Sequence, residues 1–269
     1  MRVAIYGAGK VGRGLHAALR KAGVPCSLRA ARAGLPRGPY TVDLLVITVR
    51  DRDVGPTAEA MVARGLVTSK TAVVHVAGAL PADALAALRP TSAGVAQMHP
   101  MIAFANPARA PSLPGGHVLV RGDAVAVKRA RKLASALGMR PRSIAVDEIA
   151  YHAAAGLVAN GAAALAAAGA LVLLRAGVSP DVAPKMLGPL LRSVAENVEA
   201  LGLPGALTGP VRRGDAKGVE HHLKVLSRVA PEVVALYRAL VKAQVPLARP
   251  LGDATDDALA AIERMVSDA

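Results

Sequence analysis

The sequence predicts an α/β chain in which a doubly wound parallel sheet is followed by an all-helical second half. Three observations lead to this prediction. A strand–turn–helix pattern occupies residues 2–22, and short apolar runs alternate with helical patterns up to residue 147. Beyond Asp147 no convincing strand run remains. We therefore expect two domains, residues 1–147 and 148–269.

The opening segment carries the strongest local signal. The apolar run Arg2–Tyr6 leads directly into a G-x-G-x-x-G pattern, and an amphipathic helical stretch follows at Leu15–Ala22. The first glycine allows the turn, the second lets the backbone approach a pyrophosphate, and the third lets the helix pack closely on the strand. Helix-start amides then face the phosphates. The pattern predicts a dinucleotide-binding (Rossmann) domain, with a plain structural turn as the alternative. The predicted cradle is Gly7, Ala8, Gly9, Lys10, Val11 and Gly12.

The second predicted strand, within Cys26–Arg32, indicates the type of nucleotide. A site for NAD places an acidic residue at the end of this strand, but no acid occurs between Met1 and Asp43. Arg29 and Arg32 are there instead, and guanidinium groups match a 2′-phosphate. We therefore predict NADP (NADPH) as the cofactor. The alternative is that the arginines only reflect an arginine-rich chain.

The remaining predicted strands place two histidines near the cofactor. Ligands bind beyond the carboxyl ends of strands in such sheets. His75 ends the fourth predicted strand, His99 follows the fifth, and Val49 ends the third and joins the cofactor set. Histidine is a common proton donor at neutral pH, so both are candidate catalytic residues. The expected strands are 43–49, 71–76, 93–98, 118–120 and 143–146, with a helix at about 124–137.

Helices are expected throughout the second half, at about 148–176, 180–201, 217–228, 231–243 and 253–267. On the first of these, His152 and Asn160 share one broad face, and polar groups there need partners. We include both as catalytic candidates and Tyr151 as a substrate contact. Thr208 and Arg213, in a polar insertion between helices, are further candidate substrate contacts. Turn and backbone hydrogen-bonding roles are the alternatives.

Composition excludes several classes of protein. The net charge is +14, but the basic residues are scattered and aromatic residues are nearly absent, so we do not expect nucleic acid as a partner. No metal-ligand spacing is present. The uncharged stretch 153–174 is long enough to cross a bilayer, yet its Ala and Gly content favours a buried helix. A single cysteine, Cys26, and a fold that starts at the first residues predict a cytoplasmic protein without a membrane span.

Several motifs together resemble the Rossmann-like oxidoreductase family that contains domain of unknown function 2520. They cover nearly the whole chain in order, and the last is the most specific. The motifs are the glycine turn, His75-Val-Ala-Gly78-Ala-Leu80, His99-Pro-Met101, Tyr151-His152-Ala-Ala with Asn160, and Leu207-Thr-Gly-Pro-Val-Arg-Arg-Gly-Asp215.

This resemblance implies a helical C-terminal domain of the 6-phosphogluconate dehydrogenase type, homodimers formed through those helices, and kinship with ketopantoate and pyrroline-carboxylate reductases. His-Pro-Met also resembles a segment of prephenate dehydrogenases, in which the histidine is catalytic. Related hydroxyacid dehydrogenases carry a Lys-x-x-x-Asn pair, but here Gly156 stands where that lysine would precede Asn160. The usual His-Thr-Ser-Gly segment is His-Val-Ala-Gly in this chain.

The sequence thus predicts an NADP-dependent reductase of a small anionic 2-oxo acid or imine, with ketopantoate as the most concrete substrate. His99 or His152 would donate the proton, and His75 and Asn160 would orient the substrate. The absence of a lysine at position 156 favours a non-catalytic NADP-binding sensor or scaffold as the main alternative. A prephenate-like dehydrogenase is a weaker one.

Overall fold

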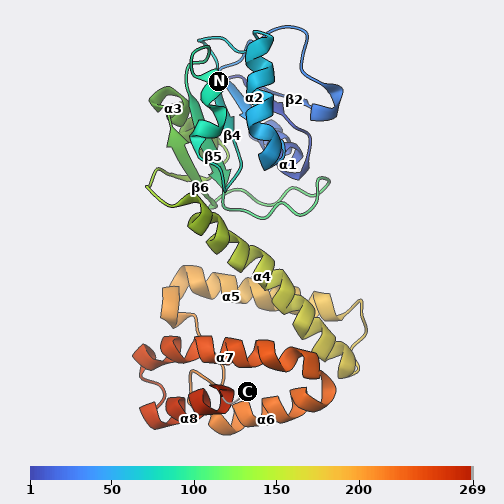
Figure 1. Ribbon diagram of the computed structural model, residues 1–269. Helices are drawn as coiled ribbons and strands as arrows, with labels where there is room; N and C mark the ends of the chain where they lie inside the picture. The colour runs from blue at the N-terminus through green and yellow to red at the C-terminus, as the bar shows by residue number, and fades with distance from the viewer. Residues whose placement is uncertain (268–269) are drawn as a thin grey trace. The chain divides into compact units, whose positions relative to one another are not determined.

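The computed structural model describes residues 1–267, which form two compact units, Met1–Leu157 and Val158–Ala269. Every strand belongs to the first unit, and the division falls within the long helix α4 (Figure 1). The strands are β1 (Val3–Tyr6), β2 (Cys26–Arg29), β3 (Leu44–Ile47), β4 (Ala72–His75), β5 (Val95–Pro100), β6 (His117–Gly122) and β7 (Arg140–Arg142). The helices are α1 (Lys10–Lys21), α2 (Val54–Ala63), α3 (Ala124–Ala136), α4 (Glu148–Arg175), α5 (Ala183–Gly205), α6 (Ala216–Val229), α7 (Val234–Ala248) and α8 (Asp256–Ser267).

The predicted doubly wound sheet followed by helices is confirmed. Its strand order is β2-β1-β3-β4-β5-β6-β7, so the order reverses beside β1. The expectation that all strands run parallel is wrong for β6, which pairs antiparallel with β5. Residues 101–116, between these two strands, contain no helix. A parallel return needs a crossover connection, whereas this segment brings the chain straight back beside β5.

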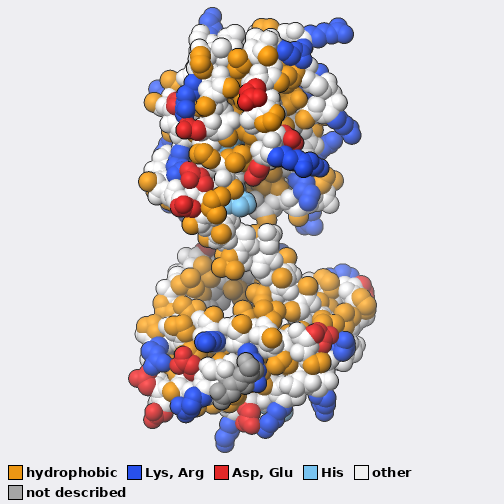
Figure 2. All heavy atoms as spheres, viewed as in Figure 1, with side chains coloured by type: hydrophobic (Ala, Val, Ile, Leu, Met, Phe, Trp, Pro, Cys, Tyr) orange, Lys and Arg blue, Asp and Glu red, His pale blue; other side chains and the backbone are white. Residues whose placement is uncertain are grey.

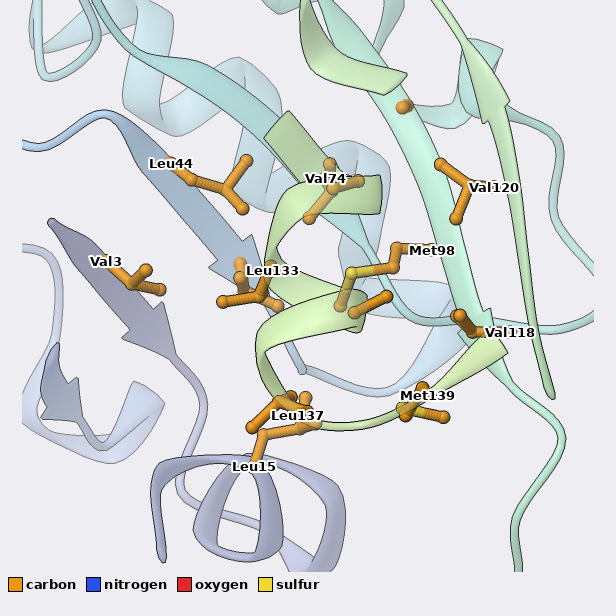
Figure 3. Close-up of a cluster of buried hydrophobic side chains, with 14 of the residues drawn as sticks. Val3, Leu15, Leu44, Val74, Met98, Val118, Val120, Leu133, Leu137 and Met139 are labelled. Atoms are coloured by element: carbon orange, nitrogen blue, oxygen red, sulfur yellow. The ribbon is translucent and has the colours of Figure 1, made fainter. Parts of the chain in front are cut away.

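Alternating residues of the buried strands face two separate hydrophobic cores. On one face, Val3, Leu44, Val74 and Met98 pack with Leu133 of α3, as Figure 3 shows. On the other face, the strands pack against α2 and the 3-10 helix η3 (Ala82–Leu88). Because β1, β3 and β4 are buried on both faces, they appear in the sequence as continuous apolar runs.

The last strand differs from its prediction. We expected residues 143–146, but β7 is Arg140–Arg142 and pairs parallel with His117–Leu119 of β6. An edge strand needs ladder bonds on one side only, so it tolerates both the proline and the exposed arginines. The carbonyl of Val146 instead accepts a hydrogen bond of 2.8 Å from Nη1 of Arg121 in β6. This bond attaches the segment before α4 to the sheet.

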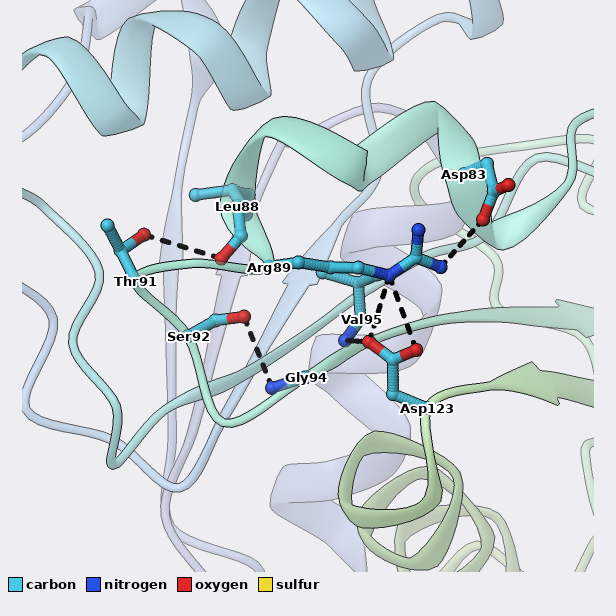
Figure 4. Close-up of polar contacts among 8 residues, drawn as sticks. All are labelled: Asp83, Leu88, Arg89, Thr91, Ser92, Gly94, Val95 and Asp123. Atoms are coloured by element: carbon cyan, nitrogen blue, oxygen red, sulfur yellow. Dashed lines mark hydrogen bonds and ion pairs between the residues drawn. The ribbon is translucent and has the colours of Figure 1, made fainter.

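An ion-pair network on the surface ties η3 to the turn before α3. Arg89 contacts Asp83 at 2.6 Å and Asp123 at 3.2 Å (Figure 4). Asp123 also accepts a 2.9 Å hydrogen bond from the backbone N–H of Val95, at the start of β5. This network ties η3 to the start of β5 and to the turn before α3.

The five helices predicted for the second half are confirmed as α4 to α8, with shifts at their ends. The largest shift is in α7, which follows a 3-10 turn at Pro231–Val233 and runs to Ala248. The second unit has its own hydrophobic core, which joins α6, α7 and α8 and includes Val219, Val241 and Ile262.

The long helix α4 differs from its prediction. No residue of α4 is buried, contrary to our expectation of a buried central helix. With a mean hydropathy of 2.1 over its most apolar window, α4 could by length and composition cross a membrane.

Candidate functional site

The glycine turn between β1 and α1 has the close contacts that its sequence predicts. Gly7 has φ +116°, and a Cβ there would lie 2.6 Å from the carbonyl oxygen of Thr48. A Cβ on Gly12 would meet the carbonyl oxygen of Gly7 and lie 2.6 Å from Oγ1 of Thr48. Thr48 itself donates a 2.7 Å hydrogen bond to the carbonyl of Gly7. No larger residue fits at either position without moving this turn.

The middle glycine faces open space, as a cradle for a pyrophosphate requires. A Cβ on Gly9 would meet nothing within 4 Å. Gly9 is the N-cap residue of α1, no side chain caps the helix start, and the first turn contains no acid. The adjoining amides of Ala8 and Lys10 therefore belong to an uncapped, electropositive helix end. The residues present fit a bound dinucleotide, with Val11 and Gly12 completing the turn.

The two arginines at the end of β2 differ in what they contact. Arg29 donates from Nε to the carbonyl of Gly34 at 2.6 Å and from Nη2 to that of Ala33 at 2.9 Å. Arg32 lies in the short 3-10 helix η1 (Ala31–Ala33), is exposed, and has no hydrogen bond or ion pair among residues 1–267. The guanidinium of Arg29 thus closes the loop, whereas that of Arg32 is available to a ligand.

His75 lies at the end of β4 and is fully buried, with both ring nitrogens engaged. The backbone N–H of Ala77 donates to Nδ1 at 3.2 Å, and Nε2 lies 2.9 Å from the carbonyl of Pro81. An accepting Nδ1 places the ring proton on Nε2, so the imidazole is neutral. Burial lowers the pKa of His75, which agrees with this state. His75 therefore fastens the segment after β4.

The structure brings together three of the candidate residues, His99, Tyr151 and His152. The ring centroid of His99, on β5, lies 5.5 Å from that of Tyr151 and 6.0 Å from that of His152. Both partners are in the first turn of α4, and all three belong to the first unit. Nδ1 of His99 is buried without a hydrogen-bond partner. Its Nε2 faces Gly78, as does Nδ1 of His152.

Burial governs the protonation of this cluster. The pKa of His99 is lowered to about 4, mainly by burial and then by the neighbouring His152, while Asp51 acts in the opposite direction. Burial also raises the pKa of the Tyr151 hydroxyl. At neutral pH His99 and Tyr151 are therefore both uncharged. His152 is exposed, so it can exchange protons with solvent.

Sequence reasoning missed Thr48, Gln97 and Gly78. Gln97, beside His75 in the β4–β5 register, is fully buried, and its Nε2 donates to the carbonyls of Ala77 at 3.0 Å and Gly78 at 3.3 Å. Its Oε1 has no hydrogen-bond partner. The available signal was a polar residue within an apolar strand, which applies to Thr48 and Gln97. Nothing local distinguishes Gly78.

The other predicted site residues are placed as follows. Val49 is half-buried just beyond β3. Asn160, Thr208 and Arg213 belong to the second unit and are exposed. Near Arg213, Asp215 caps α6 by accepting a 2.9 Å hydrogen bond from the backbone N–H of Gly218. Within residues 1–267, no cluster of three His, Cys, Asp or Glu residues could hold a metal ion.

One protein-family model matches part of the chain. Residues 117–244 match the domain of unknown function DUF2520. The match runs from β6 into α7 and includes Tyr151 and His152. It therefore confirms the resemblance inferred from the sequence motifs. None of the curated proteins matches the chain.

Solved structures similar to this chain confirm its fold. A protein from Thermotoga maritima has 21% identity and a TM-score of 0.63, over 92% of this chain and 98% of its own. An imine reductase from Pseudomonas sp. has 19% identity and a TM-score of 0.57, over 98% and 99%. A pyrroline-5-carboxylate reductase from Coxiella burnetii has 15% identity and a TM-score of 0.56, over 93% and 98%. At these identities the likeness concerns architecture.

Proposed function

We propose that the protein is an NADP-dependent oxidoreductase that reduces a small anionic 2-oxo acid or imine. The observation that carries the proposal is the combination of an open, uncapped helix start at Gly9 with a histidine cluster beyond the same sheet edge. Parallel strands present their carboxyl ends together, so a nucleotide on α1 lies on the side of the sheet where β4 and β5 end. The similar imine and pyrroline-5-carboxylate reductases support this class of reaction.

The cofactor is proposed to be NADPH, held by residues of the first unit. Amides of the Gly7–Gly12 turn would bind the pyrophosphate, and Arg32 would bind the 2′-phosphate. Arg29 would act indirectly, because its guanidinium is committed to the loop that presents Arg32. When bound, the cofactor supplies a hydride. The basic side chains also suit an acidic substrate, and Asn160, Thr208 and Arg213 remain proposed substrate contacts.

His99 and His152 are proposed to handle the proton, with different tasks. His99 is neutral at neutral pH and partly buried, which suits a fixed hydrogen-bond donor. His152 is exposed and is proposed to exchange protons with solvent. His75 is proposed to orient the adjoining segment, because both of its nitrogens are already engaged.

Turnover with a substrate panel tests this function. NADPH consumption is followed with 2-oxo acids, ketopantoate among them, and with cyclic imines. We expect turnover of at least one member, lost in His99→Asn and reduced in His152→Asn. A protein that binds NADPH tightly but consumes none of them would instead be a sensor, the alternative that Gly156 favours. Unchanged turnover in both variants would remove the histidines from the mechanism.

We further propose that the protein is a cytoplasmic homodimer formed through its C-terminal helices. Along α5, Met186, Leu190, Val194, Val198 and Leu201 form one exposed apolar stripe, with Leu190 58% and Leu201 63% exposed. Figure 2 shows hydrophobic side chains across the visible face of this unit. Water disfavours so large an apolar surface. Light scattering in detergent-free buffer should give the dimer mass, and Leu190→Glu should shift it to the monomer. Insolubility without detergent would favour a membrane role for α4.

A further inference from the structure

The backbone conformation at Gly78 does not require a glycine. Its φ is not in the left-handed region, where only glycine is readily accommodated. A Cβ built on it would nevertheless lie 2.5 Å from Nδ1 of His152 and 2.7 Å from Nε2 of His99. The three atoms nearest to that Cβ all belong to these two rings. The site, rather than the fold, therefore calls for glycine at this position.

The two ring nitrogens both lie against Gly78. Both lie within 2.7 Å of the point where a Cβ would stand, yet no hydrogen bond joins the two rings in the described part of the chain. One polar ligand atom beside this point would be within reach of both nitrogens. Two hydrogen bonds fix the backbone at Gly78: the side chain of Gln97 donates to the Gly78 carbonyl, and the N–H of Ala77 donates to His75.

Building on the proposed function, we propose that His99 and His152 together bind the carbonyl oxygen of a 2-oxo acid, and that Gly78, because it has no side chain, lets both rings take up the positions this needs. The two possible substrate classes differ in their need for a proton. A protonated imine that accepts hydride at carbon becomes a neutral amine and needs no acid. A ketone becomes an alkoxide, whose oxygen must gain a proton. Two histidines directed at one atom suit the ketone.

The reaction balances with these groups alone. A bound NADPH would supply the hydride and leave as NADP; the carbonyl carbon gains the new C–H bond while the C=O π electrons move to oxygen. His99 donates a hydrogen bond to that oxygen throughout. The imidazolium of His152 loses its N–H proton to the oxygen, giving the alcohol, and takes another proton from solvent. The charged or titratable groups around the pair are Tyr151, His75 and Asp51.

Binding of non-reacting probes tests the proposal without turnover. Oxidised NADP is first titrated into the protein, and failure to bind it would overturn the proposed function itself. Oxamate, a 2-oxo acid mimic, and proline, a cyclic ammonium, are then added while the imidazole NMR signals are followed. We expect oxamate to shift the signals of both His99 and His152 and proline to shift neither. Shifts with proline alone, or with neither probe, would overturn the carbonyl assignment.

Gly78→Ala and a matched control locate the oxygen site. Its added methyl group must displace a ring, so we expect oxamate affinity to fall about tenfold or more while NADP still binds. Gly55→Ala in α2 is the control, because its Cβ would approach nothing closer than the carbonyl of Ala84 at 3.8 Å. Should G78A not fold, His152→Asn is expected to lower oxamate affinity similarly. Wild-type affinity in the folded variant would contradict the proposal, as would turnover of cyclic imines without turnover of 2-oxo acids.

Discussion

Replacing His99 by asparagine tests whether the buried imidazole is neutral in the folded protein. Its pKa is about 4, against an ordinary value of 6.5. Between these values the unfolded chain binds a proton that the folded chain does not. The free energy of unfolding contributed by this group is therefore intact above pH 6.5, falls as the pH is lowered towards 4, and levels off below 4.

The size of this effect follows from the shift. At 1.36 kcal/mol for each pKa unit, the whole shift corresponds to about 3 kcal/mol. Since solvent reaches part of the ring, we expect about 2 kcal/mol. Urea unfolding across this pH window should show that the wild-type protein loses about this much more stability than H99N. Equal pH slopes for the two proteins would refute a neutral, buried His99.

Further predictions concern the cofactor, the cluster and the core. Arg32→Ala should weaken NADPH binding about 10- to 100-fold and leave NADH binding unchanged in calorimetric titrations; equal losses would contradict a 2′-phosphate contact. Arg29→Ala should lower stability to urea by about 2 kcal/mol, because two loop hydrogen bonds are lost. His152→Asn should raise the pKa of His99 in NMR titrations, because a nearby cation is removed. Leu133→Ala, at a fully buried position, should cost about 2–5 kcal/mol in the same unfolding assay.

The parts of the fold that were predicted correctly are those determined by short stretches of the sequence. The Gly7–Gly12 turn, the strands buried on both faces and the long helical patterns all follow from spacing and composition. Two of the errors, in the direction of β6 and the position of β7, arise at the edge of the sheet. The direction of β6 depends on how residues 101–116 cross the molecule, and β7, with the sequence Arg-Pro-Arg, lacks the apolar pattern that identifies a strand.

The part of the site that could be predicted is the part that depends on parallel strands ending at the same edge of the sheet. His99, Tyr151 and His152 were each named as candidates, but their contact with one another, and the demands on Gly78, come from side chains that are distant in the sequence. Arg29 looked equivalent to Arg32, and only the return of the loop at Gly34 shows that its guanidinium is already engaged. Such roles depend on tertiary contacts that leave no periodic signal.

Thermal unfolding with each of NADPH, NADP, NADH and NAD tests the central claim most directly. A ligand that binds only the folded protein at one hundred times its Kd stabilises it by about 2.7 kcal/mol. For a chain of this size we expect that to raise the Tm by about 5–10 °C. We predict this rise with NADPH and a clearly smaller one with NADH at equal concentration. An unchanged Tm with all four at millimolar levels would contradict nucleotide binding at the Gly7–Gly12 turn.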